Sequence, residues 1–567
     1  MFNSLTTNFN EFTTWSWAQY EPYYQDLLSR RLDSANVAGW LADWFRLRRT
    51  WHESQERLFV AITVDTTDAT AQAHHKFFYD EVYPAVQGAE QRVKEHLLAS
   101  GLEPDGFVLP LRNYRTEAAL FRQENLPLLA DEYRLSAEYD RIIGAQTVEW
   151  EGVEVTVSQL LPLFLDTDRA VRERAWRLAS QRRLADRPAI DDLWTRYMTV
   201  RGQIATNAGL PDYRLYMWSK LLRFDYTPQD CLRFHQAIEE VVVPAALRAY
   251  EKRRLRLGVK ALRPWDLDVD PFGRAPLQSY RSISELEEKT SAIFHKVDPQ
   301  LGEYFEIMRR ESLLDLDNRK GKAPGGYCTV FEVTGRPFIF ANSVGVHDDV
   351  QTLLHEGGHA FHFFEAARLP YCWNFQIPME FLEVASMAME LLAAPYLTQD
   401  EGGFYSPQDA ARARIEHQER SLLFWPYMAV VDAFQHWVYQ NHRLASDPKN
   451  CDAKWAELWA RFMPGVDWSG LDAELVTGWQ RKQHIHSDPF YYVEYGLALL
   501  GACQIWRNAL SDQAGAVAAY RRGLALGDTV TLPELYAAAG ARFAFDAGTL
   551  REAVSLIETV TERLEQV

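Results

Sequence analysis

Apolar side chains recur every three or four residues along most of this chain, and this helical periodicity restricts the fold more than any other feature. Trp40, Leu41, Trp44 and Phe45 show the pattern within the first hundred residues. The sequence shows no regular alternation of strands and helices, and no glycine-rich phosphate loop after a strand. It therefore predicts a mostly α-helical protein rather than a parallel α/β fold.

Two short segments depart from the helical pattern and are predicted to form strands. Residues 147–157 alternate polar and apolar side chains about a Glu-Gly turn, which predicts a hairpin. Residues 327–333 and 337–342 form a second predicted pair, joined by a turn at 334–336. The strand at 337–342 leads into the helix that carries the main motif. We interpret it either as an edge where an extended peptide pairs or as a core strand.

Charge and cysteine content exclude several classes of protein. The 567 residues hold 60 Lys and Arg against 78 Asp and Glu, a net charge of −18. Nucleic acids and anionic membranes both attract basic surfaces, so neither is an expected partner. The five cysteines are widely spaced, and neither a signal peptide nor a membrane-spanning run is evident. We expect a soluble cytoplasmic protein, and the sequence leaves its oligomeric state open.

Domain boundaries are only weakly marked in the sequence. The length suggests about three or four domains, but no Ser/Gly-rich linker divides the chain. We place one boundary near residue 190. Residues 1–190 are then a mostly helical N-terminal part, and residues 191–567 carry the catalytic motif described next.

The main motif is His-Glu-x-x-His, formed by His355, Glu356 and His359. Residues four apart lie on one face of a helix, so both imidazoles reach one ion. A catalytic zinc ion takes three protein ligands and a water, and Glu356 is placed as the general base for that water. The five-residue pattern alone also occurs in helices whose histidines are merely packed or solvated.

The residues around the motif fit a catalytic helix. Asp348 and Asp349 stand where a helix cap and partners of the helix dipole are expected. Gly357 and Gly358 lie inside the helix, where each costs about 1 kcal/mol relative to Ala. That cost is explained if backbone or substrate packs closely against this turn.

A third metal ligand is not fixed by the spacing of the residues. His362 shares the helix face, but it lies about 10 Å along the axis from His355, too far for both to bind one ion. We expect His362 in packing or in contact with a ligand. Glu380, Glu383 and Glu390 follow in a second apolar helix, where buried carboxylates need partners. All three are candidates, with Glu383 slightly ahead.

Together, the segments 355–362 and 381–386 resemble the zinc metallopeptidases of family M3, which include thimet oligopeptidase and oligoendopeptidase F. The resemblance implies one Zn²⁺ ion held by His355, His359 and Glu383, with Glu356 as the base. Ala385 stands where the family usually has Pro at the start of a helix. We expect this change to alter local rigidity and not the ligand.

The similarity to the family extends over about residues 145–510. The loop at 318–327 and the stretch at 168–172 resemble oligoendopeptidase F and its relatives, whereas the first 140 residues match only in their helical character. The resemblance implies two mostly helical lobes that enclose a deep channel, with a small β-sheet beside the His-Glu-x-x-His helix.

An aromatic cluster near the C-terminal end of this region completes the candidate site. His484, His486, Tyr491, Tyr492 and Tyr495 supply imidazole and phenol donors that could stabilise an oxyanion. The alternative is an aromatic core helix with locally bonded hydroxyls. The resemblance implies His484, Tyr492 and Tyr495 as catalytic residues. It leaves Tyr491 and His486 as alternatives to them, which we expect to contact the substrate.

The predicted function is a zinc-dependent endopeptidase that hydrolyses short unstructured oligopeptides. One alternative is a metal-dependent carboxypeptidase, although Gly358 replaces the Arg that usually precedes the second His of that class. The other is a non-catalytic peptide-binding protein with structural zinc, although structural sites are closed by four protein ligands. If the acidic surplus lines the channel, cationic peptides should be preferred.

Overall fold

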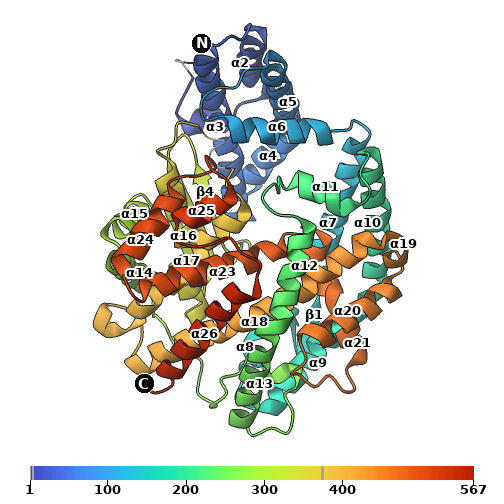
Figure 1. The fold of residues 1–567 in the computed structure, drawn as a ribbon, viewed down its shortest axis with the longest axis vertical. Coiled ribbons are helices and arrows are strands. Elements are labelled where there is room, and N and C mark those ends of the chain that lie inside the picture. Colours follow the sequence, from blue (N-terminus) through green and yellow to red (C-terminus); the bar gives the residue numbers. More distant parts are fainter. Residues whose placement is uncertain (1, 3–4, 372–375) are drawn as a thin grey trace.

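The N-terminal part folds into helices around a core of its own. The structure, a computed structural model, describes residues 2, 5–371 and 376–567. Trp40, Leu41 and Trp44 lie together in the N-terminal core, as their spacing predicts. Its helices project at one end of the molecule, in blue in Figure 1. They are α1 (Phe9–Phe12), α2 (Trp17–Ser29), α3 (Val37–Val64), α4 (Ala69–Phe77), α5 (Tyr83–Ser100) and α6 (Val108–Leu120).

The next segment contains the first predicted hairpin and a series of helices. Strands β1 (Thr147–Trp150) and β2 (Val153–Thr156) pair antiparallel, which confirms the hairpin. Asp168 then caps its helix by accepting the backbone N–H of Ala170. The helices here are α7 (Asn125–Gly144), α8 (Leu161–Phe164), α9 (Arg169–Ala185), α10 (Arg187–Asn207), α11 (Tyr213–Lys220), α12 (Pro228–Ala237), α13 (Val243–Leu257), α14 (Ile283–Val297) and α15 (Pro299–Arg310).

A small three-stranded sheet lies beside the motif helix. Strands β4 (Tyr327–Phe331) and β5 (Arg336–Ser343) form the predicted antiparallel pair. A third strand, β3 (Leu314–Asp317), which the sequence analysis missed, pairs parallel with β5. The order β3-β5-β4 makes β5 the central strand. The interpretation of β5 as a peptide-pairing edge is therefore wrong, and β4 is an outer strand.

The motif lies on α16 (His347–Ala366), which contacts both β4 and β5. The carboxylate of Asp349 accepts the backbone N–H groups of Val344, Gly345 and Val346 and so caps the start of this helix. The second apolar helix, α17 (Met379–Ala393), packs against α16. The structure thus confirms a mostly α-helical fold with a small sheet beside the His-Glu-x-x-His helix.

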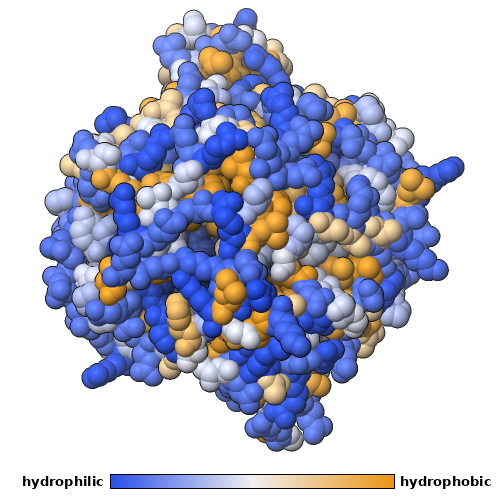
Figure 2. Space-filling view, turned by 60° about the horizontal axis from the view of Figure 1, so that its bottom comes forward, coloured by the Kyte–Doolittle hydropathy of each residue, from blue (hydrophilic) through white to orange (hydrophobic). Residues whose placement is uncertain are grey.

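C-terminal helices complete the large core around α16 and α17, and α23 packs along α17 (Figure 1). Figure 2 shows one face of the molecule hollowed near its middle, with hydrophilic and hydrophobic residues at the rim. The two lobes and the boundary near residue 190 stay predictions. The remaining helices are α18 (Pro407–Gln440), α19 (His442–Ala445), α20 (Pro448–Phe462), α21 (Asp472–Val476), α22 (Gln483–His486), α23 (Tyr492–Ala509), α24 (Gln513–Leu524), α25 (Leu532–Ala538) and α26 (Ala547–Leu564).

Two further observations concern the expected setting of the protein. Among the described residues, no helix combines the length and apolar character needed to span a membrane. Cys231, Cys328, Cys451 and Cys503 are free thiols, and Cys372 lies outside the described residues.

Candidate metal centre and active site

Helices α16 and α17 bring three potential metal ligands together. Nε2 of His355 and Nε2 of His359 lie 3.5 and 3.9 Å from Oε2 of Glu383. Potential ligand atoms of the three residues all lie within 4.8 Å of one another. Ligands about 2 Å from a tetrahedral zinc ion are about 3.3 Å apart. The donor set of two imidazoles and one carboxylate therefore fits a catalytic zinc ion in both chemistry and spacing.

The two glycines of the motif allow this close approach. A Cβ on Gly358 would lie 2.5 Å from the carbonyl oxygen of Ala385, and one on Gly357 would lie 2.6 Å from Cζ of Phe294. The backbone thus packs tightly on this turn, which confirms the expected reason for two helix-interior glycines. Ala385 itself lies inside α17 and not at its start, so the expected comparison with a helix-start Pro does not apply.

The other two glutamate candidates have different partners. Glu390 Oε1 lies 2.7 Å from Nδ1 of His355, which leaves Nε2 of that ring free for a metal. Burial lowers the pKa of His355, but the hydrogen bond and charge of Glu390 outweigh it and raise the value to about 9. Glu380 is buried beside Arg223, 3.7 Å from its Nε, and accepts a hydrogen bond from Tyr226. Of the three glutamates, the structure brings Glu383 to both histidines.

Glu356 lies where a general base is needed. Its side chain is almost buried, and the backbone N–H of Cys328 on β4 lies near enough to favour its ionised form. Burial raises the pKa of Glu356 to about 7 against the opposing attraction of His355. A carboxylate with such a pKa takes up and releases a proton near neutral pH.

His362 takes the packing role that its distance along the helix predicts. The side chain is buried, and its ring packs edge-on against Phe381 at 5.7 Å. Neither ring nitrogen has a hydrogen-bond partner among the described residues.

Part of the aromatic cluster lies beside the metal centre. The hydroxyl of Tyr491 donates a hydrogen bond of 3.3 Å to Oε1 of Glu383. The ring of Tyr495 lies 5.2 Å from that of Tyr491, and His484 lies 5.7 Å from Tyr491 and 6.0 Å from Tyr495. Burial raises the pKa of both tyrosines, so both hydroxyls stay protonated and available as donors. Burial also lowers the pKa of His484 to about 4, which keeps its imidazole neutral.

Two members of the predicted cluster are held differently. Tyr492 is 7% exposed, its ring lies 5.0 Å from that of His484, and Nζ of Lys482 lies 3.8 Å from its ring centre. These contacts do not test its predicted catalytic role, and we assign the oxyanion contact to Tyr495 instead. His486 is fully buried and stacks on Tyr139 at 4.3 Å and on Trp479 at 5.8 Å. A substrate has no access to His486, so its prediction as a substrate contact is corrected to a core position.

A cavity of about 690 Å³ is lined by α13, α18, the loop at 267–274 and the last residues of the chain. It shares Arg420 and Phe424 with a smaller pocket formed by Glu390 and His417. Nδ1 of His417 lies 3.5 Å from Oε2 of Glu390, so this helix reaches the residues behind His355. Sequence reasoning missed His417 and Arg420, because nothing in the pattern of α18 separates them from an ordinary polar helix face.

The chain matches known proteins over most of its length. Residues 163–555 match the model of peptidase family M3, and residues 9–105 match the peptidase M3 N-terminal domain. A structure of PZ peptidase A with inhibitor 2 is 27% identical, with a TM-score of 0.87, and covers 100% of this chain and 99% of its own. An oligoendopeptidase F structure is 28% identical, with a TM-score of 0.87 and coverage of 99% and 98%.

Further comparisons agree on the fold. An oligoendopeptidase F from Bacillus anthracis str. Ames is 24% identical, covers 97% of each chain and has a TM-score of 0.83, which supports the fold alone. No curated protein matches the chain. The family model covers well over half of the sequence and includes every residue of the metal centre. The chain therefore belongs to peptidase family M3 and is a metallopeptidase.

Proposed function

We propose that this metallopeptidase is a zinc-dependent endopeptidase that hydrolyses short unstructured oligopeptides. The observation that carries the proposal is the convergence of His355, His359 and Glu383, with the carboxylate of Glu356 beside them. Three protein ligands with a neighbouring acid-base group are typical of a catalytic zinc site, whereas structural zinc sites have four protein ligands. One ion is expected in this centre.

The residues around this centre can carry out peptide hydrolysis. A bound zinc ion supplies polarisation of the scissile carbonyl and lowers the pKa of a water towards 7. Glu356 accepts a proton from the attacking water and delivers it to the leaving amine. Tyr495 donates a hydrogen bond to the carbonyl oxygen as negative charge develops on it, Tyr491 holds the carboxylate of Glu383, and neutral His484 orients the substrate beside them.

The strands and the cavity support an extended peptide as the substrate. β4 is an outer strand of the sheet, and the backbone of its Cys328 lies near Glu356. A peptide paired along β4 would therefore pass beside the base. The cavity of about 690 Å³ shares Arg420 and Phe424 with the pocket at Glu390 and offers room for several side chains. The matched structures named PZ peptidase A and oligoendopeptidase F are consistent with peptide substrates. Four free thiols support a reducing, cytoplasmic location.

Internally quenched peptides blocked at both ends test the proposal. The purified protein with Zn²⁺ should cleave them at internal bonds, and a chelator should stop the reaction until Zn²⁺ is added back. His359→Ala, which removes one ligand, serves as the inactive control. A protein that cleaves only peptides with a free C-terminus would be a carboxypeptidase, and activity that survives complete metal removal would exclude the zinc mechanism.

A further inference from the structure

A second group of potential metal ligands lies on helices α12 and α18, apart from the metal centre described above. Cys231 and His235 are four residues apart on α12, and Asp432 and His436 are four residues apart on α18. Residues at this spacing share one face of a helix. The two helices pack against each other, so both pairs meet at their interface.

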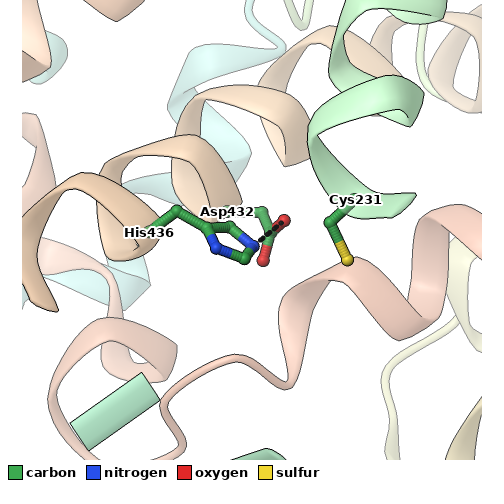
Figure 3. A group of neighbouring side chains, drawn as sticks. All are labelled: Cys231, Asp432 and His436. Atoms are coloured by element: carbon green, nitrogen blue, oxygen red, sulfur yellow. Dashed lines mark ion pairs between the residues drawn. The ribbon is translucent and has the colours of Figure 1, made fainter. Parts of the chain in front are cut away.

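All four side chains are shielded from solvent, with at most 2% of any residue exposed. Figure 3 shows the imidazole of His436 and the carboxylate of Asp432 pointing toward one another, with the sulfur of Cys231 across from them on the neighbouring helix. Potential ligand atoms of Cys231, Asp432 and His436 all lie within 4.8 Å of one another. A single ion placed among these atoms would therefore contact all three residues.

Several polar atoms of this group lack hydrogen-bond partners among the described residues. They are Oδ1 of Asp432 and both ring nitrogens of His436, although Nε2 of His436 lies 3.3 Å from Oδ2 of Asp432. Buried polar atoms without partners each cost about 1–3 kcal/mol, so such groups need an explanation. A cation between the sulfur, the carboxylate and the imidazole would provide the missing interactions.

His235 completes the arrangement from the other side of the carboxylate. Its Nε2 lies 2.8 Å from Oδ2 of Asp432, a contact that fixes the orientation of the carboxylate. Carboxylates and histidines outside the ligand set commonly hold metal ligands in this way. The nearby Arg223 is already engaged by Glu494 and by the backbone oxygen of Phe490, so it does not serve as the counter-ion of Asp432.

We propose that Cys231, Asp432 and His436 bind one transition-metal ion, which links α12 to α18. A mixed sulfur, nitrogen and oxygen donor set suits Zn²⁺, whereas Mg²⁺ and Ca²⁺ prefer oxygen ligands alone. The Cys231 thiol would lose its proton on binding, as a metal-bound cysteine does. Although structural zinc sites usually have four protein ligands, the complete burial of this three-ligand group closes it to a peptide substrate, so the ion would link the two helices and would not act in catalysis.

Metal content and Co²⁺ spectra of the full-length protein test this site. The double variant His359→Ala/Glu383→Ala lacks two of the three catalytic ligands. We expect the wild type to bind two equivalents of Zn²⁺ and this variant to retain one, at the proposed second site. Replacing Zn²⁺ by Co²⁺ should give a thiolate-to-cobalt charge-transfer band in both proteins. This band reports on the proposed second site alone, because the catalytic ligand set contains no thiolate. Cys231→Ser should abolish the band, and Cys503→Ser, a change at another buried cysteine, should retain it.

The wild type and the double variant decide the outcome even if Cys231→Ser fails to fold. One equivalent of metal in the wild type, none in the double variant and no charge-transfer band would overturn the proposal. A band that persists in folded Cys231→Ser would also overturn it, because another cysteine would then be the ligand.

Discussion

Tyr491 and Tyr495 lie on the same side of the metal centre, but their hydroxyl groups have different surroundings. Tyr491 donates to the ligand Glu383 at 3.3 Å, so it holds that carboxylate in place. Tyr495 is partly exposed, and its ring contacts Tyr491 and His484. Tyr492 packs under Lys482 and is nearly buried. Substitution of each of these three tyrosines is therefore expected to have a different effect.

Tyr495→Phe should lower kcat/KM by about 10²–10³-fold with zinc content unchanged, because one donor to the developing oxyanion is lost. Tyr491→Phe should instead weaken zinc binding by about 10–100-fold, because it frees a ligand carboxylate. Tyr492→Phe is the matched control and should leave both quantities within a few fold, about the range expected of a core hydroxyl. Peptide kinetics and zinc titrations distinguish the three. A Tyr492→Phe variant as inactive as Tyr495→Phe would contradict this assignment.

The sequence predicts individual site residues well where local spacing carries the information. His355, Glu356 and His359 lie on one helix, so a period of four residues is enough to bring them together. Glu380, Glu383 and Glu390 belong to another helix, and the pattern of that helix puts Glu383 only slightly ahead of the other two. The family resemblance implies Glu383, and the crossing of α17 over α16 brings this carboxylate to both histidines. The core position of His486 could not be predicted in this way. Its ring packs on those of Tyr139 and Trp479, and no local sequence pattern connects either residue to it.

At the level of elements, the crossing of α16 and α17 positions the metal ligands. Gly358 is the point of closest approach found at this crossing, because a Cβ there would lie 2.5–2.6 Å from the backbone of α17. Backbone atoms cannot move aside as a flexible side chain can. The distance between the two histidines and Glu383 therefore depends on this glycine.

Gly358→Ala should destabilise the protein by about 2 kcal/mol or more and weaken zinc binding, because α17 has to shift away. Gly88→Ala, at an exposed position of helix α5 with no atom within 4 Å of the added Cβ, is the matched control. It should be neutral or more stable by up to about 1 kcal/mol. Thermal unfolding and zinc titration measure both effects. Equal stability of the two variants would contradict the close crossing.

The contact between α6 and the loop at 525–531 should be sensitive to pH. Burial raises the pKa of Asp528 to about 7, against the attraction of Arg112. The folded protein therefore holds a proton that the unfolded chain releases above about pH 4. The contribution of Asp528 to the free energy of unfolding is therefore fully present below about pH 4 and is lost as the pH rises from about 4 to 7.

Asp528→Asn should remove this dependence, because an amide stays neutral throughout. The variant should be more stable than the wild type by about 2–4 kcal/mol at pH 8 and nearly equal to it at pH 4. Denaturant unfolding at both pH values measures the difference. A variant that is less stable than the wild type at pH 8 would show that Asp528 is ionised and favourably paired in the folded protein.

The strands show which elements a sequence pattern can predict. β1–β2 and β4–β5 are hairpins, and each is marked by alternation around a short turn. β3 is only four residues long and pairs in parallel with a strand that begins about twenty residues later, so neither a turn nor its length marks it. The central position of β5 follows from this unmarked strand, which is why its interpretation as an edge was wrong.

For the molecule as a whole, the net charge of −18 is not concentrated in the cavity of about 690 Å³. Five arginines and five carboxylates line that cavity: Arg253, Arg256, Arg274, Arg412 and Arg420 with Asp268, Asp270, Glu416, Glu419 and Glu565. Many of them pair with one another, as Arg412 does with Asp270 and Glu416. The expected preference for cationic peptides therefore finds no support in the cavity.

A balanced cavity predicts weak electrostatic steering of substrates. The kcat/KM values of a cationic and an anionic quenched peptide of equal length should each change by less than about tenfold between low and high salt, because strong steering gives about 10–10³-fold effects. The same uncharged flanking sequence in both peptides is the control for length and composition. A large loss confined to the cationic peptide at high salt would reveal a negative channel.

The proposed mechanism depends most on one group, the carboxylate of Glu356. Glu356→Gln preserves the size and burial of the side chain and removes its ability to accept a proton. The direct measurement is kcat/KM on doubly blocked peptides together with zinc content for this variant. Zinc binding should stay stoichiometric at the catalytic centre while kcat/KM falls by about 10²–10⁴-fold or more. Near-normal hydrolysis by the zinc-loaded variant would contradict the role of Glu356 as the general base.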